Sequence, residues 1–205
     1  KRVRDLDDAL LESLVKNGYV SRFDETIFEK ECDDEIILCL NYDGLYGINN
    51  INRYLQNNNP ASPVIWGMNT YKENDPILFN ESRIFSPLIH NNSKGKIVGI
   101  DVNELQIKFK IELDESINEM DAENYLFELL GESKSGKSII SFVINKMNNS
   151  DEDDVDDDLT IVPFQVAYAV SIHKAQGLEY DSVKIIISNE IEEQITHNIF
   201  YTAIT

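Results

Sequence analysis

The chain has 205 residues, with 18 basic and 37 acidic side chains, so its formal net charge is −19. Hydrophobic residues make up 42% of it, which is enough apolar surface to bury a core and excludes a chain that is disordered throughout. No stretch approaches the roughly 20 consecutive apolar residues of a spanning helix, and the start, KRVRDLDDALLE, lacks the apolar segment of a signal peptide. We therefore expect a soluble, cytoplasmic protein with no membrane partner.

The negative charge is unevenly distributed. Residues 151–158 contain seven acids in eight positions, and without them the net charge is −19 + 7 = −12, whereas residues 71–113 carry six acids and six bases. Exposed charges act over about 10 Å in salt, so the total charge weighs against a nucleic-acid partner without excluding one. We expect 151–158 to be a solvated acidic loop.

The first third of the chain reads as helix, strand and helix. Residues 5–18 follow an amphipathic helical spacing, with Gly18 as the stop. Residues 35–40, EIILCL, predict a short buried strand, and a helix follows from Ile48. This strand–loop–helix unit is typical of a parallel sheet. Cys32 and Cys39 flank one apolar run and are expected to be buried free thiols, with no metal site.

From Tyr71 the pattern changes to short β-prone runs separated by turns. Residues 91–95 predict a hairpin turn, and residues 105–111 alternate apolar and polar as a half-buried strand does, with Leu105, Ile107, Phe109 and Ile111 as its apolar members. Residues 124–130 fit a helix or a strand, and SIISFVINK predicts a strand. The product is a small antiparallel barrel or sheet. After the acidic loop, residues 160–171 and 181–188 are again strand-like.

Gly131–Ser138, GESKSGKS, fits the phosphate-cradling pattern G-x-x-x-x-G-K-[ST]. Such a loop requires a helix after it, because the amides at the helix N-terminus hold the phosphates. The residues that follow, IISFVI, are β-branched and aromatic and favour a strand. The context therefore favours a polar hairpin turn, and a phosphate-loop kinase that uses Lys137 is the less favoured alternative.

The stretch AYAVSIHKAQGLEYDSV, residues 167–183, places a hydroxyl, an imidazole, an ammonium and an amide directly after a predicted strand that ends at Ser171. Gly177 then permits a tight bend. The carboxyl ends of parallel strands are where open α/β sheets bind ligands, and these groups suit phosphates and sugars. A helix capped by His173 beside a solvated Lys174 explains the same residues, and the residues alone leave both interpretations open.

This stretch resembles the Thr/Ser-x-His motif in the second motor domain of superfamily 1 DNA helicases, and IHKAQGLEYDSV is most similar to the RecD-like branch. Three further segments resemble that family in the same order: NYDGLYGINNIN with LQ at 41–56, NDPILF with NSKG at 74–95, and FYTAIT at 200–205. The resemblance spans about 35–205. It implies a UvrD-like C-terminal domain whose fold is a RecA-like parallel sheet with helices on its faces, interrupted by an inserted antiparallel barrel of the Src-homology-3 type.

The resemblance also implies roles for individual residues. It implies single-stranded DNA contacts from Ser171, His173 and Lys174. It places near the nucleotide cleft a second set: Gln176, Gly177, Glu179, Tyr201, Thr202 and Thr205. The family's arginine, which reaches the γ-phosphate, is expected immediately after Thr205. The phosphate loop and the magnesium-binding acids are expected in a first motor domain outside this chain, so no complete catalytic set is expected within it.

We therefore divide the chain into residues 1–70 and 159–205, two parts of a motor domain 2A, and residues 71–158, an inserted 2B-like β-rich subdomain. The expected function is that of a C-terminal fragment of an ATP-dependent DNA helicase, which couples ATP hydrolysis to 5′–3′ translocation on single-stranded DNA and to unwinding. ATP and Mg²⁺ are the expected cofactors of the full-length protein, with none tightly bound to the fragment. The alternative is a nucleic-acid or protein-binding adaptor without motor activity.

Overall fold

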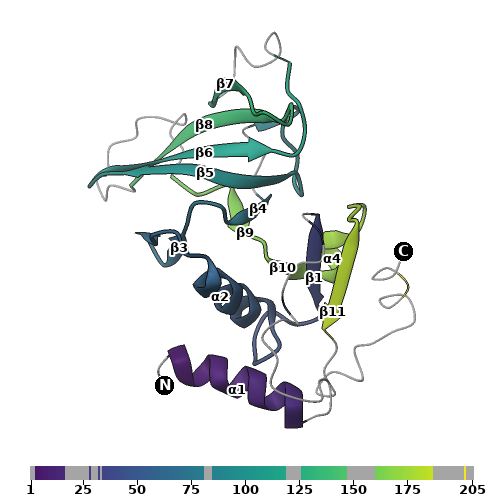
Figure 1. Cartoon of the computed structure of the whole chain (residues 1–205). Coiled ribbons are helices and arrows are strands. Elements are labelled where there is room, and N and C mark those ends of the chain that lie inside the picture. The colour runs from purple at the N-terminus through teal and green to yellow at the C-terminus, as the bar shows by residue number, and fades with distance from the viewer. Residues whose placement is uncertain are drawn as a thin grey trace. The chain divides into compact units, whose positions relative to one another are not determined.

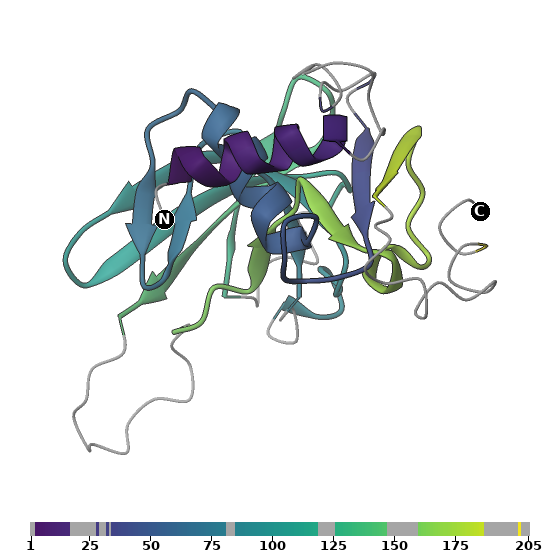
Figure 2. The ribbon, with the colours of Figure 1, turned by 90° about the horizontal axis from the view of Figure 1, so that it is seen from below.

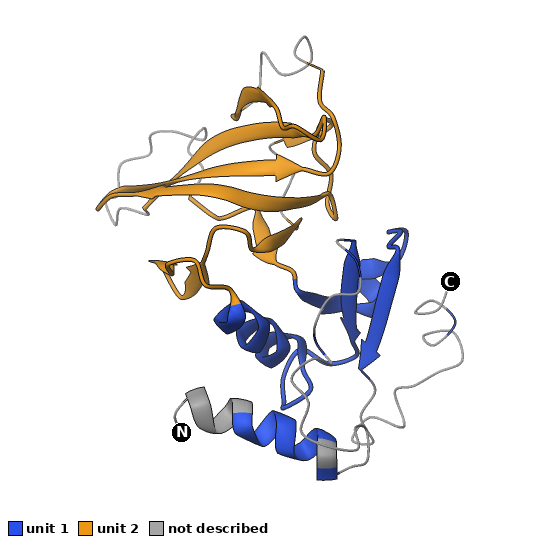
Figure 3. Cartoon of the chain, viewed as in Figure 1, with its two compact units in different colours: residues 1–58, 168–205 blue, residues 59–167 orange. Residues whose placement is uncertain are grey.

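A computed structural model describes residues 3–16, 28, 32, 34–80, 85–118, 126–146, 160–186 and 201. The chain divides into two units, which Figure 3 colours separately: unit 1 comprises residues 1–58 and 168–205, and unit 2 comprises residues 59–167. The boundaries thus lie at 58/59 and 167/168 instead of the expected 70/71 and 158/159. Hydrophobic burial explains the shift, because the core of unit 2 includes apolar side chains from both margins: Val64, Trp66, Tyr71, Val162, Phe164 and Val166.

Unit 1 contains a three-stranded parallel sheet in the order β10–β1–β11 (Figure 1). Its strands are β1 (Glu35–Cys39), β10 (Ala169–Ser171) and β11 (Ser182–Ile186). In this sheet Ile37 pairs with Ala169 on one side and with Lys184 on the other. Every residue of β1 is buried, as expected for a central strand of a parallel sheet. The predicted parallel sheet, built from both halves of the sequence, is therefore confirmed.

Two helices cover the core of unit 1: α1 (Val3–Lys16) and α2 (Ile48–Asn58). In Figure 1 α1 lies below α2, and in Figure 2, seen from below, α1 crosses in front of it. Their apolar faces meet over β1 in one cluster with the helical spacing that the sequence predicts. That cluster includes Leu10, Leu14, Ile37, Cys39, Ile48, Ile51 and Tyr54. Helix α1 ends at Lys16, and the predicted stop, Gly18, lies outside the described residues.

Unit 2 is built from antiparallel strands. A hairpin of β2 (Val64–Trp66) and β3 (Asn69–Tyr71) precedes a six-stranded sheet in the order β7–β8–β6–β5–β4–β9. The strands of this sheet are β4 (Pro76–Phe79), β5 (Lys94–Val102), β6 (Gln106–Leu113), β7 (Glu128–Glu132), β8 (Ser138–Asn145) and β9 (Phe164–Val166). The described ladder ends at β7 and β9, which shows an antiparallel sheet. Closure into a barrel of the Src-homology-3 type stays a prediction.

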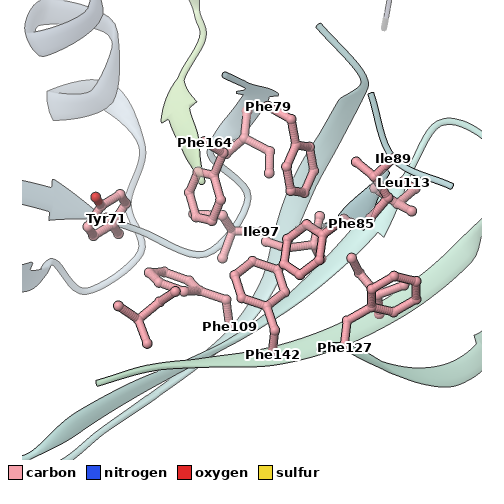
Figure 4. Packing of buried hydrophobic residues seen from close by; sticks show 14 of the residues in the cluster. Tyr71, Phe79, Phe85, Ile89, Ile97, Phe109, Leu113, Phe127, Phe142 and Phe164 are labelled. Atoms are coloured by element: carbon pink, nitrogen blue, oxygen red, sulfur yellow. The ribbon is translucent and has the colours of Figure 1, made fainter. Parts of the chain in front are cut away.

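Aromatic rings fill the core of unit 2 (Figure 4). The rings of Phe109 and Phe164 lie 5.0 Å apart between centroids at 81°, and those of Phe85 and Phe142 lie 5.2 Å apart. The first pair is edge-to-face and the second is tilted at 53°, and aromatic pairs add about 0.5–1.5 kcal/mol each to the burial of the rings. The rings come from β3, β4, β6, β8 and β9 and from the segments after β4 and before β7, so the core joins strands that are distant in sequence.

The structure corrects several local predictions. In β6 the buried residues are Ile107, Phe109, Ile111 and Leu113, whereas Leu105 is 67% exposed because it lies in the turn before the strand. The predicted turn at 91–95 is shorter, since β5 already begins at Lys94. Residues 124–130, which fitted a helix or a strand, contribute to β7. Residues 151–158 lie outside the described residues.

The run predicted as one β-like stretch, 160–171, divides between two sheets. Strand β9 pairs with β4 in the antiparallel sheet, and β10 pairs with β1 in the parallel sheet. Between them, the amide of Ala167 still donates to the carbonyl of Pro76 at 2.8 Å. From Tyr168 the chain belongs to unit 1. Residues 160–171 contain no Gly, Asn or Asp, so the sequence carries no turn signal for this change of sheet.

Candidate functional site at the carboxyl edge of the parallel sheet

The carboxyl ends of β1, β10 and β11 lie at one edge of the sheet, because all three strands are parallel. At this edge β1 leads into the loop 40–47, and β10 leads into the short helix α4 (Ile172–Ala175). This is the edge at which open α/β sheets place ligand-binding groups. The structure thus brings the informative stretch of the sequence to the place where chemistry is expected.

Ser171 caps helix α4. Its side chain oxygen accepts a hydrogen bond from the backbone amide of Lys174 at 3.2 Å, and its backbone is extended with φ −74° and ψ 148°. This is the geometry of an N-cap. The cap of the helix is therefore Ser171 rather than His173. Ser171 itself is buried, with 4% of its surface exposed, so the structure shows its hydroxyl as a helix cap, and its contact to DNA stays a prediction.

The residues after Ser171 differ in their exposure. Ile172 is buried and anchors the helix, whereas His173 is exposed and Lys174 is half-buried. Gly177 has a φ of +83°, which confirms the predicted bend, since L side chains rarely adopt this conformation. A backbone hydrogen bond of 2.9 Å from Leu178 to Ala175 closes the turn.

The expected nucleotide-cleft residues are only partly described. Gln176, Gly177 and Glu179 are exposed in and after the turn that follows α4, so one short segment brings them together with the expected DNA-binding residues. Tyr201 is 60% exposed. Thr202 and Thr205 lie outside the described residues. The roles expected for these residues stay predictions.

The loop after β1 is held tightly where it enters α2. The amide of Ile48 donates to the carbonyl of Asn41 at 2.9 Å, and the side chain amide of Asn49 donates to Asp43 at 3.0 Å. At Gly47 an added Cβ would lie 2.5 Å from the carbonyl oxygen of Asp43, so only glycine fits there. The glycine at position 47 of this segment therefore has a steric cause.

A residue whose role the sequence reasoning missed connects α2 to β10. The side chain of Asn52 donates to the carbonyl of Ala169 at 2.9 Å and accepts from the amide of the same residue at 2.8 Å. Asn is a poor helix former, so its place next to the buried Ile51 in the middle of an amphipathic helix was a usable signal. The sequence could not show which backbone groups it would meet.

The opposite edge of the same sheet carries a buried ion pair. The carboxylate of Glu35, whose side chain is 2% exposed, lies 2.7 Å from the ammonium of Lys184 and accepts from the hydroxyl of Ser182 at 2.8 Å. Both partners belong to β11, which pairs directly with β1. Because it lies away from the carboxyl edge, we assign this pair to holding the strands in register.

The phosphate-loop match at 131–138 is a hairpin turn. The amide of Ser133 donates to the carbonyl of Lys137 at 2.8 Å, Gly136 has a φ of +74°, and strand β8 follows in place of a helix. Lys137 forms an ion pair of 2.6 Å with Asp114, and buried Ser138 accepts from the amide of Ile117 at 2.7 Å. The alternative of a kinase that uses Lys137 is therefore wrong.

Both cysteines have free thiols. Cys39 is buried as predicted, and burial raises the pKa of its thiol to about 12. Cys32 is half-buried instead of buried, because its side chain lies outside the apolar cluster of unit 1. In the described part of the chain, no helix is long and apolar enough to cross a membrane.

Residues 166–205 match the UvrD-like helicase C-terminal domain. The resemblance that the motif around His173 indicated is thus confirmed. The UvrD-like segment begins at the end of β9 and contains β10, α4 and β11, so it covers every described residue of the expected sites. A comparison with curated proteins gives no match.

Among solved structures, the chain is similar to a Pif1 helicase from Bacteroides in complex with ADP-AlF3 and single-stranded DNA, with 15% identity and a TM-score of 0.47 over 99% of this chain and 42% of that one. It is also similar to Bacteroides Pif1 bound to single-stranded DNA, with 12% identity and a TM-score of 0.48 over 96% of this chain and 45% of that one. The chain thus spans less than half the length of these structures.

Proposed function

We propose that this chain forms the second motor domain of an ATP-dependent DNA helicase that moves along single-stranded DNA and unwinds duplexes. One observation carries the proposal. Strands separated in sequence by all of unit 2 join one parallel sheet, and its carboxyl edge bears Ser171, His173 and Lys174 within the UvrD-like segment. Donors at this edge are suited to phosphate oxygens.

In this function the three residues bind the backbone of the single strand. The Ser171 hydroxyl donates to a phosphate oxygen while it caps α4, and the exposed His173 contacts the strand beside it. The ammonium of Lys174 adds a point charge. Because phosphate contacts release counterions, the binding is expected to weaken as salt concentration rises.

The described residues fit one half of a nucleotide site. Exposed Gln176 and Glu179 follow the strand end, where they can donate and accept hydrogen bonds, while the described residues include no phosphate loop. Magnesium-bound ATP, when present, supplies the phosphoryl transfer that powers movement. We propose that Gly177, Tyr201, Thr202 and Thr205 lie beside the same cleft, and that a first motor domain outside this chain completes it.

We also propose the polarity of movement, the closure of unit 2 and the cellular location of the protein. The helicase moves 5′ to 3′, unit 2 closes into a barrel of the Src-homology-3 type, and the protein acts in the cytoplasm. Polarity is read from the direction in which a tailed duplex is unwound.

Substitution of His173 tests the DNA site. In the intact protein, His173→Ala is expected to raise the half-saturating concentration of oligo-dT for ATP hydrolysis about tenfold, because a charge-assisted or neutral contact of this kind is worth roughly 1–2 kcal/mol. The melting temperature should stay unchanged, since the side chain is exposed. His90→Ala is the matched control, because His90 is also exposed but lies in unit 2. Equal values for both variants would refute the assignment.

A second candidate is an adaptor that binds nucleic acid or protein without motor activity. It is favoured by the tip of the β2–β3 hairpin, where Ile65 is 72% exposed and Met68 is fully exposed. Exposed apolar side chains of this kind occur at interaction surfaces. DNA binding by the intact protein without DNA-stimulated ATP hydrolysis would support the adaptor.

A further inference from the structure

Strand β10, which ends in Ser171, is held on its outer side by a side chain. The described sheet places β10 at one edge, with β1 as its neighbour on the other side. On the outer side Asn52 forms two hydrogen bonds, 2.8 Å and 2.9 Å long, with the amide and the carbonyl of Ala169. A carboxamide can do this because it carries one acceptor and one donor group. Asn52 thereby takes the place that a residue of a further strand would take.

The two hydrogen bonds between Asn52 and Ala169, which we call the clamp, lie close to the expected DNA-binding residues. Ala169 precedes Ser171 by two positions, which corresponds to roughly 7 Å along a strand. Strand β10 has only three residues, so two additional backbone hydrogen bonds are a large part of what fixes it. A shift of β10 would move the Ser171 cap, and with it the helix that carries His173 and Lys174.

Asn52, the other end of the clamp, belongs to α2, a helix that starts at the carboxyl edge of the parallel sheet. Helix α2 begins directly after the loop 40–47, to which it is held by the bond from Ile48 to Asn41 and by the bond from Asn49 to Asp43. A helix is a stiff element, so a displacement of this loop is transmitted to Asn52 one turn further along. The loop after β1 and the end of β10 are thus connected through α2.

We propose that Asn52 is a positioning residue for the nucleic-acid site: it sets the place of Ser171, His173 and Lys174 by tying β10 to α2. This inference rests on the helicase function proposed above. Asn52 does not touch DNA in this role. Its side chain determines where the hydroxyl and the imidazole stand, and it makes their position depend on the loop after β1.

The test disrupts one or both of these hydrogen bonds by substitution of Asn52. Asn52→Asp keeps the size of the side chain but replaces the donor by a charged acceptor that faces the carbonyl of Ala169, and Asn52→Ala removes both bonds. Asn57→Asp is the matched control, because it makes the same change at an exposed position of the same helix. His173→Ala reports on the proposed function itself. All variants are made in the intact protein and compared by oligo-dT-stimulated ATP hydrolysis below their melting temperatures.

Asn52→Asp and Asn52→Ala are expected to raise the half-saturating concentration of oligo-dT about tenfold, while kcat at saturating DNA stays within about twofold and Asn57→Asp behaves as the wild type. A merely structural role lowers the melting temperature and the active fraction, but leaves the half-saturating concentration of the folded molecules unchanged. If both Asn52 variants keep the wild-type half-saturating concentration while His173→Ala raises it, this inference is wrong and the proposed function stands. An unaffected His173→Ala overturns the DNA site, and the inference with it.

Discussion

The two units of this protein differ in the interactions that stabilise each of them internally. Unit 2 has a core of packed aromatic rings supplied by five strands and by the segments after β4 and before β7, in which Phe79, Phe109 and Phe164 are almost completely buried. Unit 1 has a smaller and largely aliphatic core, and its sheet is also fixed by polar side chains: Asn52 binds the backbone of β10, and Glu35 binds two side chains of β11. Apolar packing is non-directional, whereas hydrogen bonds set positions.

This difference in stabilising interactions parallels the distribution of the expected site residues. The parallel sheet of unit 1 bears the expected site residues, and polar side chains bind its strands at the outer side of β10 and at the amino end of β1. The six-stranded sheet of unit 2 bears none of the expected DNA or nucleotide residues, and its aromatic core contributes stability. Substitutions in each unit can therefore separate loss of stability from loss of position.

The largest effect is expected from truncation of the aromatic core. Phe109→Ala should destabilise unit 2 by about 3–5 kcal/mol, because it removes a fully buried ring and leaves a cavity among its neighbours. Trp66 is the only tryptophan and packs against this core, so its fluorescence in a urea titration reports on unit 2. Leu105→Ala is the control, since Leu105 is 67% exposed and should cost less than about 0.5 kcal/mol. Similar costs for the two variants would contradict the central role of the aromatic core.

A smaller loss is expected when the buried ion pair of unit 1 is broken. Glu35→Gln should cost roughly 2 kcal/mol, because it leaves the partly buried ammonium of Lys184 without its countercharge. In a Cys32→Ser background the buried Cys39 is the remaining thiol, so its labelling rate reports the opening of unit 1. This rate should rise about 30-fold.

The control for the ion pair lies in unit 2. Glu128 and Lys108 form an exposed pair at 3.9 Å, and Glu128→Gln should cost at most about 1 kcal/mol, measured by the fluorescence of Trp66. If both substitutions prove equally mild, Glu35 does not hold the strands of unit 1 together, and the contrast between the units disappears.

The smallest effect is a loss of stability at alkaline pH. Burial raises the pKa of Cys39 from 9.0 to about 12, so above pH 9 the unfolded state releases a proton that the folded state keeps. The free energy of unfolding should therefore fall by roughly 1 kcal/mol between pH 8 and pH 10 on account of this thiol. The measurement is urea unfolding at both pH values, compared with Cys39→Ala. An identical pH dependence in the variant would show that the thiol ionises equally in both states.

Much of the fold could be predicted because it depends on local pattern. The continuous apolar run of β1, the alternation in β6 and the amphipathic spacing of α2 each determine a single type of element. The strand-like residues after Lys137 also favoured a hairpin turn over a phosphate loop, and β8 confirms the strand. For the candidate site, the order of Ser171, His173 and Lys174 after a strand indicated the correct edge of the sheet.

Other features could not be predicted because they depend on partners distant in sequence. The run 160–171 reads as one strand, yet β9 and β10 join different sheets, since their neighbours are contributed by β4 and β1. The clamp from Asn52 to Ala169 spans 117 positions, and the pair from Glu35 to Lys184 spans 149. No local pattern contains such a pairing.

By itself the sequence determined the kinds of elements, the motif at residues 171–179 and the UvrD-like resemblance, because side chain chemistry and periodicity are properties of short segments. The tertiary structure decided which strands share a sheet, that Ser171 rather than His173 caps α4, and that Asn52 secures the strand before it. These outcomes follow from backbone groups that need hydrogen-bond partners and find them only when distant parts of the chain meet.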